Sequence, residues 1–150
     1  MADTRVQLEV EDWVRREWMR DRFATRFSRE RVRLSPGGYF DADAVSEDFK
    51  IVAAISTSGA RTSGGKNVVG KMLKIRSDMY FPLLTDAQRR LVVLTEADMF
   101  AQCQKEAAGG RVPKTVEFFH AEIPHDLKVR LVASRGVASG EISVRGKPRT

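Results

Sequence analysis

The chain has few of the residues that build disulfides and zinc sites. Among its 150 residues there is one cysteine, Cys103, and there are only two histidines. An intrachain disulfide and a cysteine-based zinc cluster are therefore excluded. Neither an HExxH nor a CxxC motif occurs, which argues against the common zinc-dependent enzymes. Cys103 falls within a helical pattern, where we expect a small half-buried residue.

Long apolar stretches are also missing. No run approaches the roughly 18 consecutive apolar residues of a membrane span, and the first residues lead into charged sequence without the apolar core of a signal peptide. We therefore expect a cytoplasmic protein with no membrane partner. The hydrophobic content of 42% is enough for a real core. We expect one α/β domain over residues 1–135 and a basic, flexible tail over residues 136–150.

Charge is present in quantity but is unevenly spread. The net charge of +6 combines −3 over residues 36–50, +4 over residues 51–78 and +5 over residues 127–150 with small contributions elsewhere. Basic segments favour polyanions, so DNA or RNA is one expected partner. A net charge of this size also serves solubility alone. The composition leaves both interpretations open.

Hydrophobic periodicity and turn signals predict the order α-β-β-β-α-β-α-β-α. Three strands follow one another closely, and the last two strands each follow a helix that can serve as a crossover. This pattern predicts an α/β (α+β) fold with a mixed sheet of about five strands flanked by helices. The predicted helices are 5–24, 66–84, 97–108 and 125–134, and the predicted strands are 29–35, 39–46, 50–57, 90–94 and 116–123.

Acids and cations surround the second and third predicted strands. Asp41 and Asp43 lie on the second strand, and a Gly/Ser/Lys loop and a basic helix follow the third. Backbone amides at a helix N-terminus bind anions, and lysines add charge. The predicted phosphate-binding residues are Gly64, Gly65, Lys66, Lys71, Lys74 and Arg76. The letters from Gly65 to Lys71 fit a P-loop, but Met72 stands where its Mg²⁺-binding Ser or Thr belongs.

The element order together with Asp43 resembles the restriction-endonuclease-like superfamily, named for its PD-(D/E)XK motif. The common core of that family is a helix, a three-strand meander, a helix and a further strand, here residues 6–94. The resemblance implies that Asp43, with Asp41 beside it, binds Mg²⁺ for phosphodiester cleavage. It also implies a glutamate from the first helix, either Glu11 or Glu17; we assign Glu17 to the predicted catalytic set with Asp43 and Lys66.

The third strand departs from the family motif. Ser56 and Ser58 stand where the motif has an acid and, two residues later, a lysine. A neutral hydroxyl is a poor substitute for a carboxylate ligand of Mg²⁺. Lys66 is the residue expected to stand in for the missing lysine, and no residue replaces the acid.

Three functions are consistent with these features. The first is a nucleic-acid-associated protein on a nuclease-like scaffold with a degraded catalytic motif. The second is an active nuclease dependent on Mg²⁺ or Mn²⁺. The third is a non-enzymatic interaction or regulatory protein, in which helices 5–24 and 97–108 form partner surfaces or the interface of a homodimer.

Overall fold

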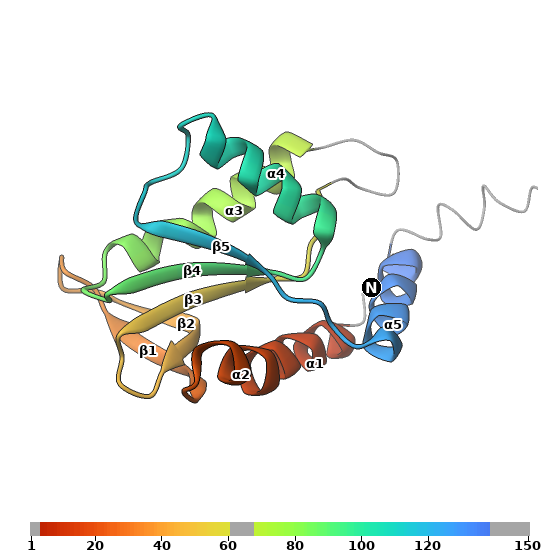
Figure 1. Cartoon of the computed structure of the whole chain (residues 1–150), viewed down its shortest axis with the longest axis horizontal. Coiled ribbons are helices and arrows are strands. Elements are labelled where there is room, and N and C mark those ends of the chain that lie inside the picture. Colours follow the sequence, from red (N-terminus) through yellow and green to blue (C-terminus); the bar gives the residue numbers. More distant parts are fainter. Residues whose placement is uncertain (1–3, 61–67, 139–150) are drawn as a thin grey trace, which may run out of the picture.

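A mixed five-stranded β-sheet forms the centre of the molecule (Figure 1). The computed structural model describes residues 4–60 and 68–138. The strands are β1 (Phe27–Arg33), β2 (Tyr39–Ser46), β3 (Ile51–Ser56), β4 (Arg89–Leu94) and β5 (Val116–His120), and they lie side by side in this order. The first three form an antiparallel meander joined by short turns, whereas β3, β4 and β5 run parallel. The fold is thus α+β with flanking helices, as predicted.

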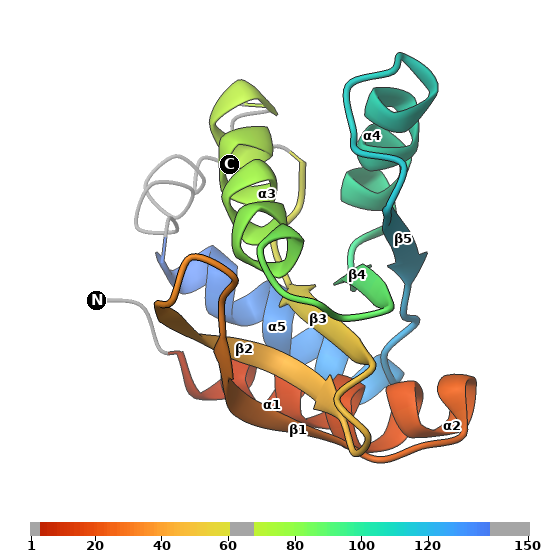
Figure 2. The ribbon, with the colours of Figure 1, turned by 90° about the vertical axis from the view of Figure 1, so that its left-hand side faces the viewer.

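Helices cover both faces of the sheet, as Figures 1 and 2 show. Three helical segments, α1 (Arg5–Trp13), η1 (Val14–Trp18) and α2 (Met19–Phe23), lie on one face together with α5 (His125–Ala138). The other face carries α3 (Val68–Leu83) and α4 (Ala97–Ala108). None of the helices in the described part of the chain is long and apolar enough to cross a membrane.

The central strands are apolar on both faces because both faces are covered. In β4, Leu91 and Val93 face α1 and α5, while Val92 and Leu94 face α3 and α4. All four side chains are at most 1% exposed. Two cores therefore hold the sheet between its helices, and a third, smaller cluster lies under the β1–β2 hairpin. β1, at the edge, is the least covered strand.

The first helix contains a π-helical turn that the sequence did not reveal. The predicted helix 5–24 is confirmed as a helical run, but residues Val14–Trp18 form η1. Such a turn inserts one extra residue and changes which side chains face inward. Val14 and Arg15 are both buried although they are adjacent in sequence. Ala24, with a left-handed φ of 57°, ends the run.

The apolar face predicted for α3 is only partly buried. Met72, Ile75 and Met79 pack beneath the helix, whereas Leu73 and Tyr80 are more than half exposed. The broad apolar face that the periodicity predicts is therefore present, but only one stripe of it is covered. The helix packs over β3 and β4, and its outer stripe faces away from the sheet, where no described element packs against it.

Two further expectations need correction. Cys103 is fully buried rather than half-buried, because α4 turns it toward Met99 and the sheet. The last helix runs to Ala138, three residues beyond the boundary predicted for the tail. Residues 139–150 lie outside the described residues.

Candidate functional site

The candidate site lies where β2 and β3 separate. Their pairing is confined to Ala44 opposite Ala53 and Val45 opposite Val52. β2 also carries a bulge where it pairs with β1. Ser28 pairs with Val45 and Glu30 pairs with Ala42, so β2 has one more residue than β1 between these two pairs. A bulge bends a strand and increases its twist. The β1–β2 hairpin accordingly turns toward the end of α3, as Figure 2 shows.

Asp43 occupies the point of separation. Its Oδ2 accepts a hydrogen bond of 2.9 Å from the Ile55 amide, so the carboxylate replaces the backbone acceptor that a continuous ladder would supply. Its carbonyl oxygen accepts a bond of 2.7 Å from Nε of Arg15, whose side chain is almost fully buried beneath the sheet. Asp43 therefore ties β2 to β3 and to the first helix.

Glu11 lies beside this aspartate. Burial raises the pKa of Glu11, and the neighbouring Asp43 carboxylate raises it further. Three cations, Arg15, Arg29 and Lys74, act on the pKa in the opposite direction. Charges from η1, β1, β2 and α3 therefore all act on Glu11.

The structure distinguishes the two helix glutamates that the sequence left open. Glu17 forms an exposed ion pair of 3.7 Å with Arg20 and lines a separate depression with Glu9 and Asp12. It does not join Asp43. The two positions are six residues apart in a helical run, which places them on different sides of it. Glu11, not Glu17, is the helix glutamate beside the strand aspartate.

A depression of about 200 Å³ opens between the hairpin and α3. Its lining consists of Phe40, Asp41, Asp43, Ala53, Ala54, Ser77, Asp78, Phe81 and Pro82. Lys74 contacts its rim through Asp78, at 3.3 Å. Burial raises the pKa of Asp78, and Asp43 adds to the effect, whereas Lys74 opposes it. The acids of β2 and a lysine of α3 thus lie on the same side of the sheet.

The depression lacks the ligand set of a metal site. Asp41 forms an ion pair of 3.1 Å with Arg31, and one oxygen of Asp43 is occupied by the Ile55 amide. The third strand contributes Ala53 and Ala54, which carry no ligand atoms. Across residues 4–60 and 68–138, no three Asp, Glu, His or Cys side chains are close enough to hold a metal ion.

The predicted phosphate-binding residues divide in space. Arg76 is directed to α4, where it binds Glu106 at 2.8 Å, and Arg111 binds the same carboxylate at 3.3 Å. Lys74 remains at the depression, and Lys71 is half-buried one turn earlier in α3. The other three, Gly64, Gly65 and Lys66, lie outside the described residues.

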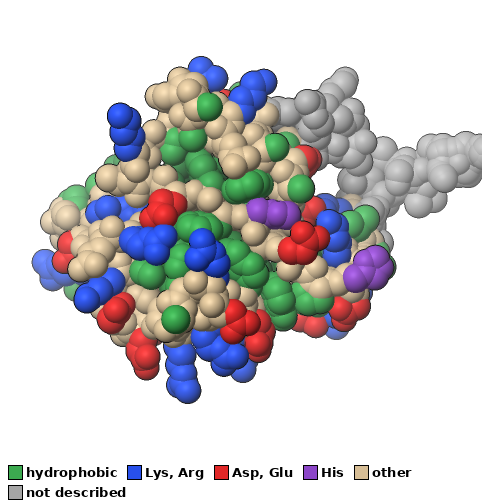
Figure 3. Space-filling view, in the orientation of Figure 1, with side chains coloured by type: hydrophobic (Ala, Val, Ile, Leu, Met, Phe, Trp, Pro, Cys, Tyr) green, Lys and Arg blue, Asp and Glu red, His purple; other side chains and the backbone are tan. Residues whose placement is uncertain are grey.

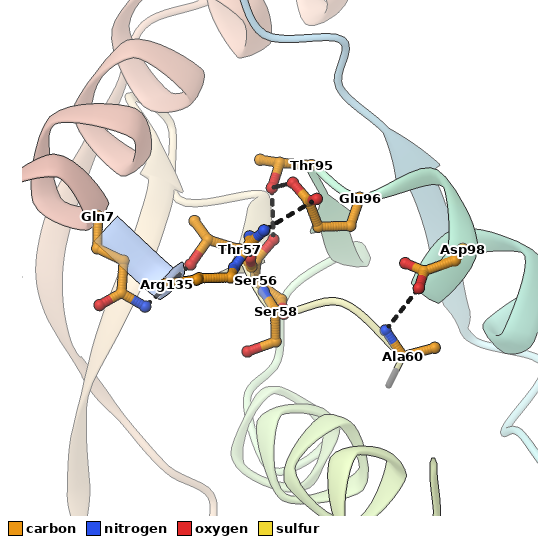
Figure 4. Close-up of polar contacts among 9 residues, drawn as sticks. All are labelled: Gln7, Ser56, Thr57, Ser58, Ala60, Thr95, Glu96, Asp98 and Arg135. Atoms are coloured by element: carbon orange, nitrogen blue, oxygen red, sulfur yellow. Dashed lines mark hydrogen bonds and ion pairs between the residues drawn. The ribbon is translucent and has the colours of Figure 1, made fainter. Parts of the chain in front are cut away.

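Ser56 and Ser58 belong to a different polar group, at the carboxyl ends of β3 and β4 (Figure 4). Ser56 is buried and its Oγ accepts a bond of 3.3 Å from the Ser58 amide. Between them, the Thr57 hydroxyl accepts a bond of 3.1 Å from Gln7, and the Thr57 carbonyl accepts one from Arg135. These contacts fasten α1 and α5 to the end of β3.

Glu96 completes this group. Its carboxylate accepts bonds from Thr95 Oγ1 at 3.0 Å and from Arg135 at 3.3 Å. Asp98, in the first turn of α4, accepts a bond of 3.2 Å from the Ala60 amide. The dashed lines in Figure 4 mark these contacts. We interpret this group as a structural network, distinct from the opening at Asp43.

Sequence reasoning missed two members of the candidate site. Arg15 is one of nine arginines in the first 35 residues, and nothing in the pattern marks it as the buried one. Asp78 follows Lys71, Lys74 and Arg76 on α3, and only these cations were assigned to the site from the sequence. Their roles depend on the π-helical turn and on the bend of the hairpin, which bring distant segments together.

Comparison of the chain with protein-family models, with curated proteins and with solved structures finds no significant match. The resemblance to the restriction-endonuclease-like superfamily therefore stays a prediction.

Proposed function

We propose that the protein is a nucleic-acid-associated module, built on a nuclease-like scaffold, whose catalytic motif is incomplete. The observation that carries the proposal is the exposed Lys74 of α3, whose partner Asp78 lines the same opening as Asp43 where β2 separates from β3. Arg29 of β1 and Lys74 both lower the pKa of Glu11, so cations from two elements that are distant in sequence act on this region. This arrangement suits contacts to phosphates on either side of it.

Lys74, Lys71 and Arg29 are the groups that we assign to phosphates. The Lys74 side chain is 68% exposed, and its ion pair with Asp78 is weak enough to exchange for a phosphate. One oxygen of Asp43 is already bound to the Ile55 amide, which limits its repulsion of a phosphate backbone. Over the face seen in Figure 3, cations and acids are interspersed, so local cations rather than one broad basic patch would determine binding.

Binding through phosphates is salt-dependent and depends little on sequence. The test is a mobility-shift titration of the full chain with mixed DNA and RNA, beginning at about 50 mM salt. Lys74→Glu should weaken binding to all sequences alike. It should also reduce the slope of log K against log salt concentration by about one. Lys128→Glu, on exposed α5 across the sheet, makes the same charge change and serves as the matched control. No shift at low salt, or equal losses in both variants, would refute the proposal.

Metal-dependent cleavage is the second candidate, and the position of Glu11 beside Asp43 favours it. The resemblance implies this pair of acids, one from the helix and one from the strand. Cleavage would be assayed with Mg²⁺ and with Mn²⁺ in the parent, in Glu11→Gln and in Asp43→Asn. Activity that disappears in both variants supports a nuclease. Activity that is unchanged in them belongs to another site or to a contaminant.

A further inference from the structure

The outer edge of β1 is open. β1 is the first strand of the sheet, so only β2 pairs with it. The Leu34 amide donates to the Gly38 carbonyl at 2.7 Å, which fixes the alternation of bonded and non-bonded pairs along the hairpin. Arg31 and Arg33 then fall in non-bonded pairs, and their amide and carbonyl groups point away from β2. Among the described residues, no backbone group outside the sheet bonds to them.

Residues of β1 also line a groove of about 420 Å³. Five consecutive residues, 31–35, form one wall, while Phe49 and Asp86 also line it. Phe49 is 51% exposed and has a φ of 60°. A bulky side chain rarely adopts this left-handed conformation, and such strain is concentrated at sites where a side chain is used. Phe49 therefore supplies an aromatic surface beside the unpaired backbone.

Partners on β2 hold the two arginines in place. Arg31 lies opposite Asp41 and binds it at 3.1 Å, with both side chains more than 60% exposed. Arg33 lies opposite Tyr39, and its guanidinium is 6.0 Å from the centre of the ring. Exposed ion pairs contribute little, so a ligand carboxylate can replace Asp41. The groove thus combines free backbone groups, an aromatic side chain and two positioned cations.

We propose that this edge binds an extended peptide segment of a partner protein, with acidic side chains at alternate positions, as an additional strand. Backbone bonds would give affinity, and the side chains that alternate toward Arg31 and Arg33 would give specificity. This goes beyond the proposed binding of nucleic acid. It uses the backbone edge of β1 and requires a ligand with a peptide backbone.

Charge argues against two other occupants. In a pair of β1 edges from two copies of the chain, Arg29, Arg31 and Arg33 would face the same arginines of the other copy, which is unfavourable. Charged edge strands commonly prevent such pairing. The segment 139–150 of this chain carries three cations and one acid, so it also matches the arginines poorly.

The test uses fluorescence anisotropy of a labelled synthetic octapeptide in which glutamate alternates with threonine, added to the full chain. Three matched peptides serve as controls. One replaces glutamate with lysine, and the other two carry N-methyl groups on alternate amides, one peptide for each of the two possible sets. We expect saturable binding of the glutamate peptide, no binding of the lysine peptide, and about tenfold weaker binding for only one N-methyl set, since strand addition uses one edge of the peptide.

Protein variants test the same contacts. The double variant Arg31→Glu, Arg33→Glu should lose the glutamate peptide and bind the lysine peptide instead. Asp41→Asn, which releases Arg31, should strengthen binding of the glutamate peptide, an increase that damage to the fold would not produce. Phe49→Gly should weaken binding while Phe49→Tyr retains it. Circular dichroism and thermal melting show that each variant is folded.

Three outcomes overturn the inference. The first is equal affinity for the glutamate and lysine peptides. The second is affinity that neither N-methyl set reduces. The third is a nucleic acid that binds through Arg31 and Arg33 while the glutamate peptide does not bind, which would assign the arginines to phosphates instead.

Discussion

Replacement of Asp43 by alanine should destabilise the fold, whatever the chemistry of the opening. The carboxylate is the acceptor for the Ile55 amide at 2.9 Å, and Ile55 is only 5% exposed. Alanine leaves that amide without an acceptor in a place that water barely reaches. Asparagine keeps an oxygen acceptor and removes the negative charge next to Glu11.

The expected magnitude follows from these contacts. A hydrogen bond to a charged group contributes about 1.5–3 kcal/mol, and the loss of one partner leaves the other unsatisfied. Asp43→Ala should lower the free energy of unfolding by about 2 kcal/mol, and Asp43→Asn by less than about 1 kcal/mol. Asp41→Ala is the matched control. It removes only an exposed ion pair with Arg31 and should cost at most about 0.5 kcal/mol.

Urea denaturation followed by circular dichroism measures these differences. With a slope of about 1–3 kcal/mol per molar urea, Asp43→Ala should move the midpoint by about 1 M. If Asp43→Ala and Asp41→Ala have the same midpoint as the parent, the carboxylate does not join β2 to β3 and our interpretation of the separation is wrong. A large loss in Asp43→Ala also means that only Asp43→Asn is a clean variant for cleavage assays.

The remaining predictions concern other ionisable groups. The pKa of Glu11 is raised in the folded state, so its charged form disfavours folding. Glu11→Gln should therefore be more stable than the parent at about pH 8, and this advantage should disappear near about pH 4. Urea midpoints measured across this pH range would show the change. Burial raises the pKa of Cys103 to about 12, so a thiol reagent should label the protein only after unfolding; rapid labelling of the native protein would contradict the described packing. Arg76 lowers the pKa of Glu106, so the contribution of this ion pair to stability is present at neutral pH and is lost as the pH falls. Arg76→Ala should therefore lower the thermal midpoint at pH 7 by more than at pH 4. Lys105→Ala, which changes an exposed side chain, should alter neither midpoint.

Local patterns predicted the elements well where propensity and packing agree. The predicted bounds of β2 and α4 are those of the structure, because turn residues and an alternating or 3.6-residue pattern mark them. The π-helical turn was not predicted, since no local signal in the sequence marks it. The exposed stripe of α3 was also missed, because periodicity shows that a face is apolar and not whether anything covers it.

The candidate site was predicted in part. Asp43 and Lys74 were named from their strand and helix, and the structure brings both to one opening. The choice between Glu11 and Glu17 could not be made from spacing alone, because the π-helical turn alters the faces of the helix between them. Arg76 was grouped with Lys74 by proximity in sequence, yet two residues along a helix differ by about 200° in direction, and Arg76 binds α4 instead.

The amino-acid sequence determined the order and type of the elements, because apolar periodicity, glycine and proline turns and charge spacing act over a few residues. The tertiary structure alone decided which acid stands beside Asp43, which arginine is buried and which strand edge stays open. Those outcomes depend on the bulge in β2 and on the bend of the hairpin over α3. Both arise from packing between segments that are distant in the chain.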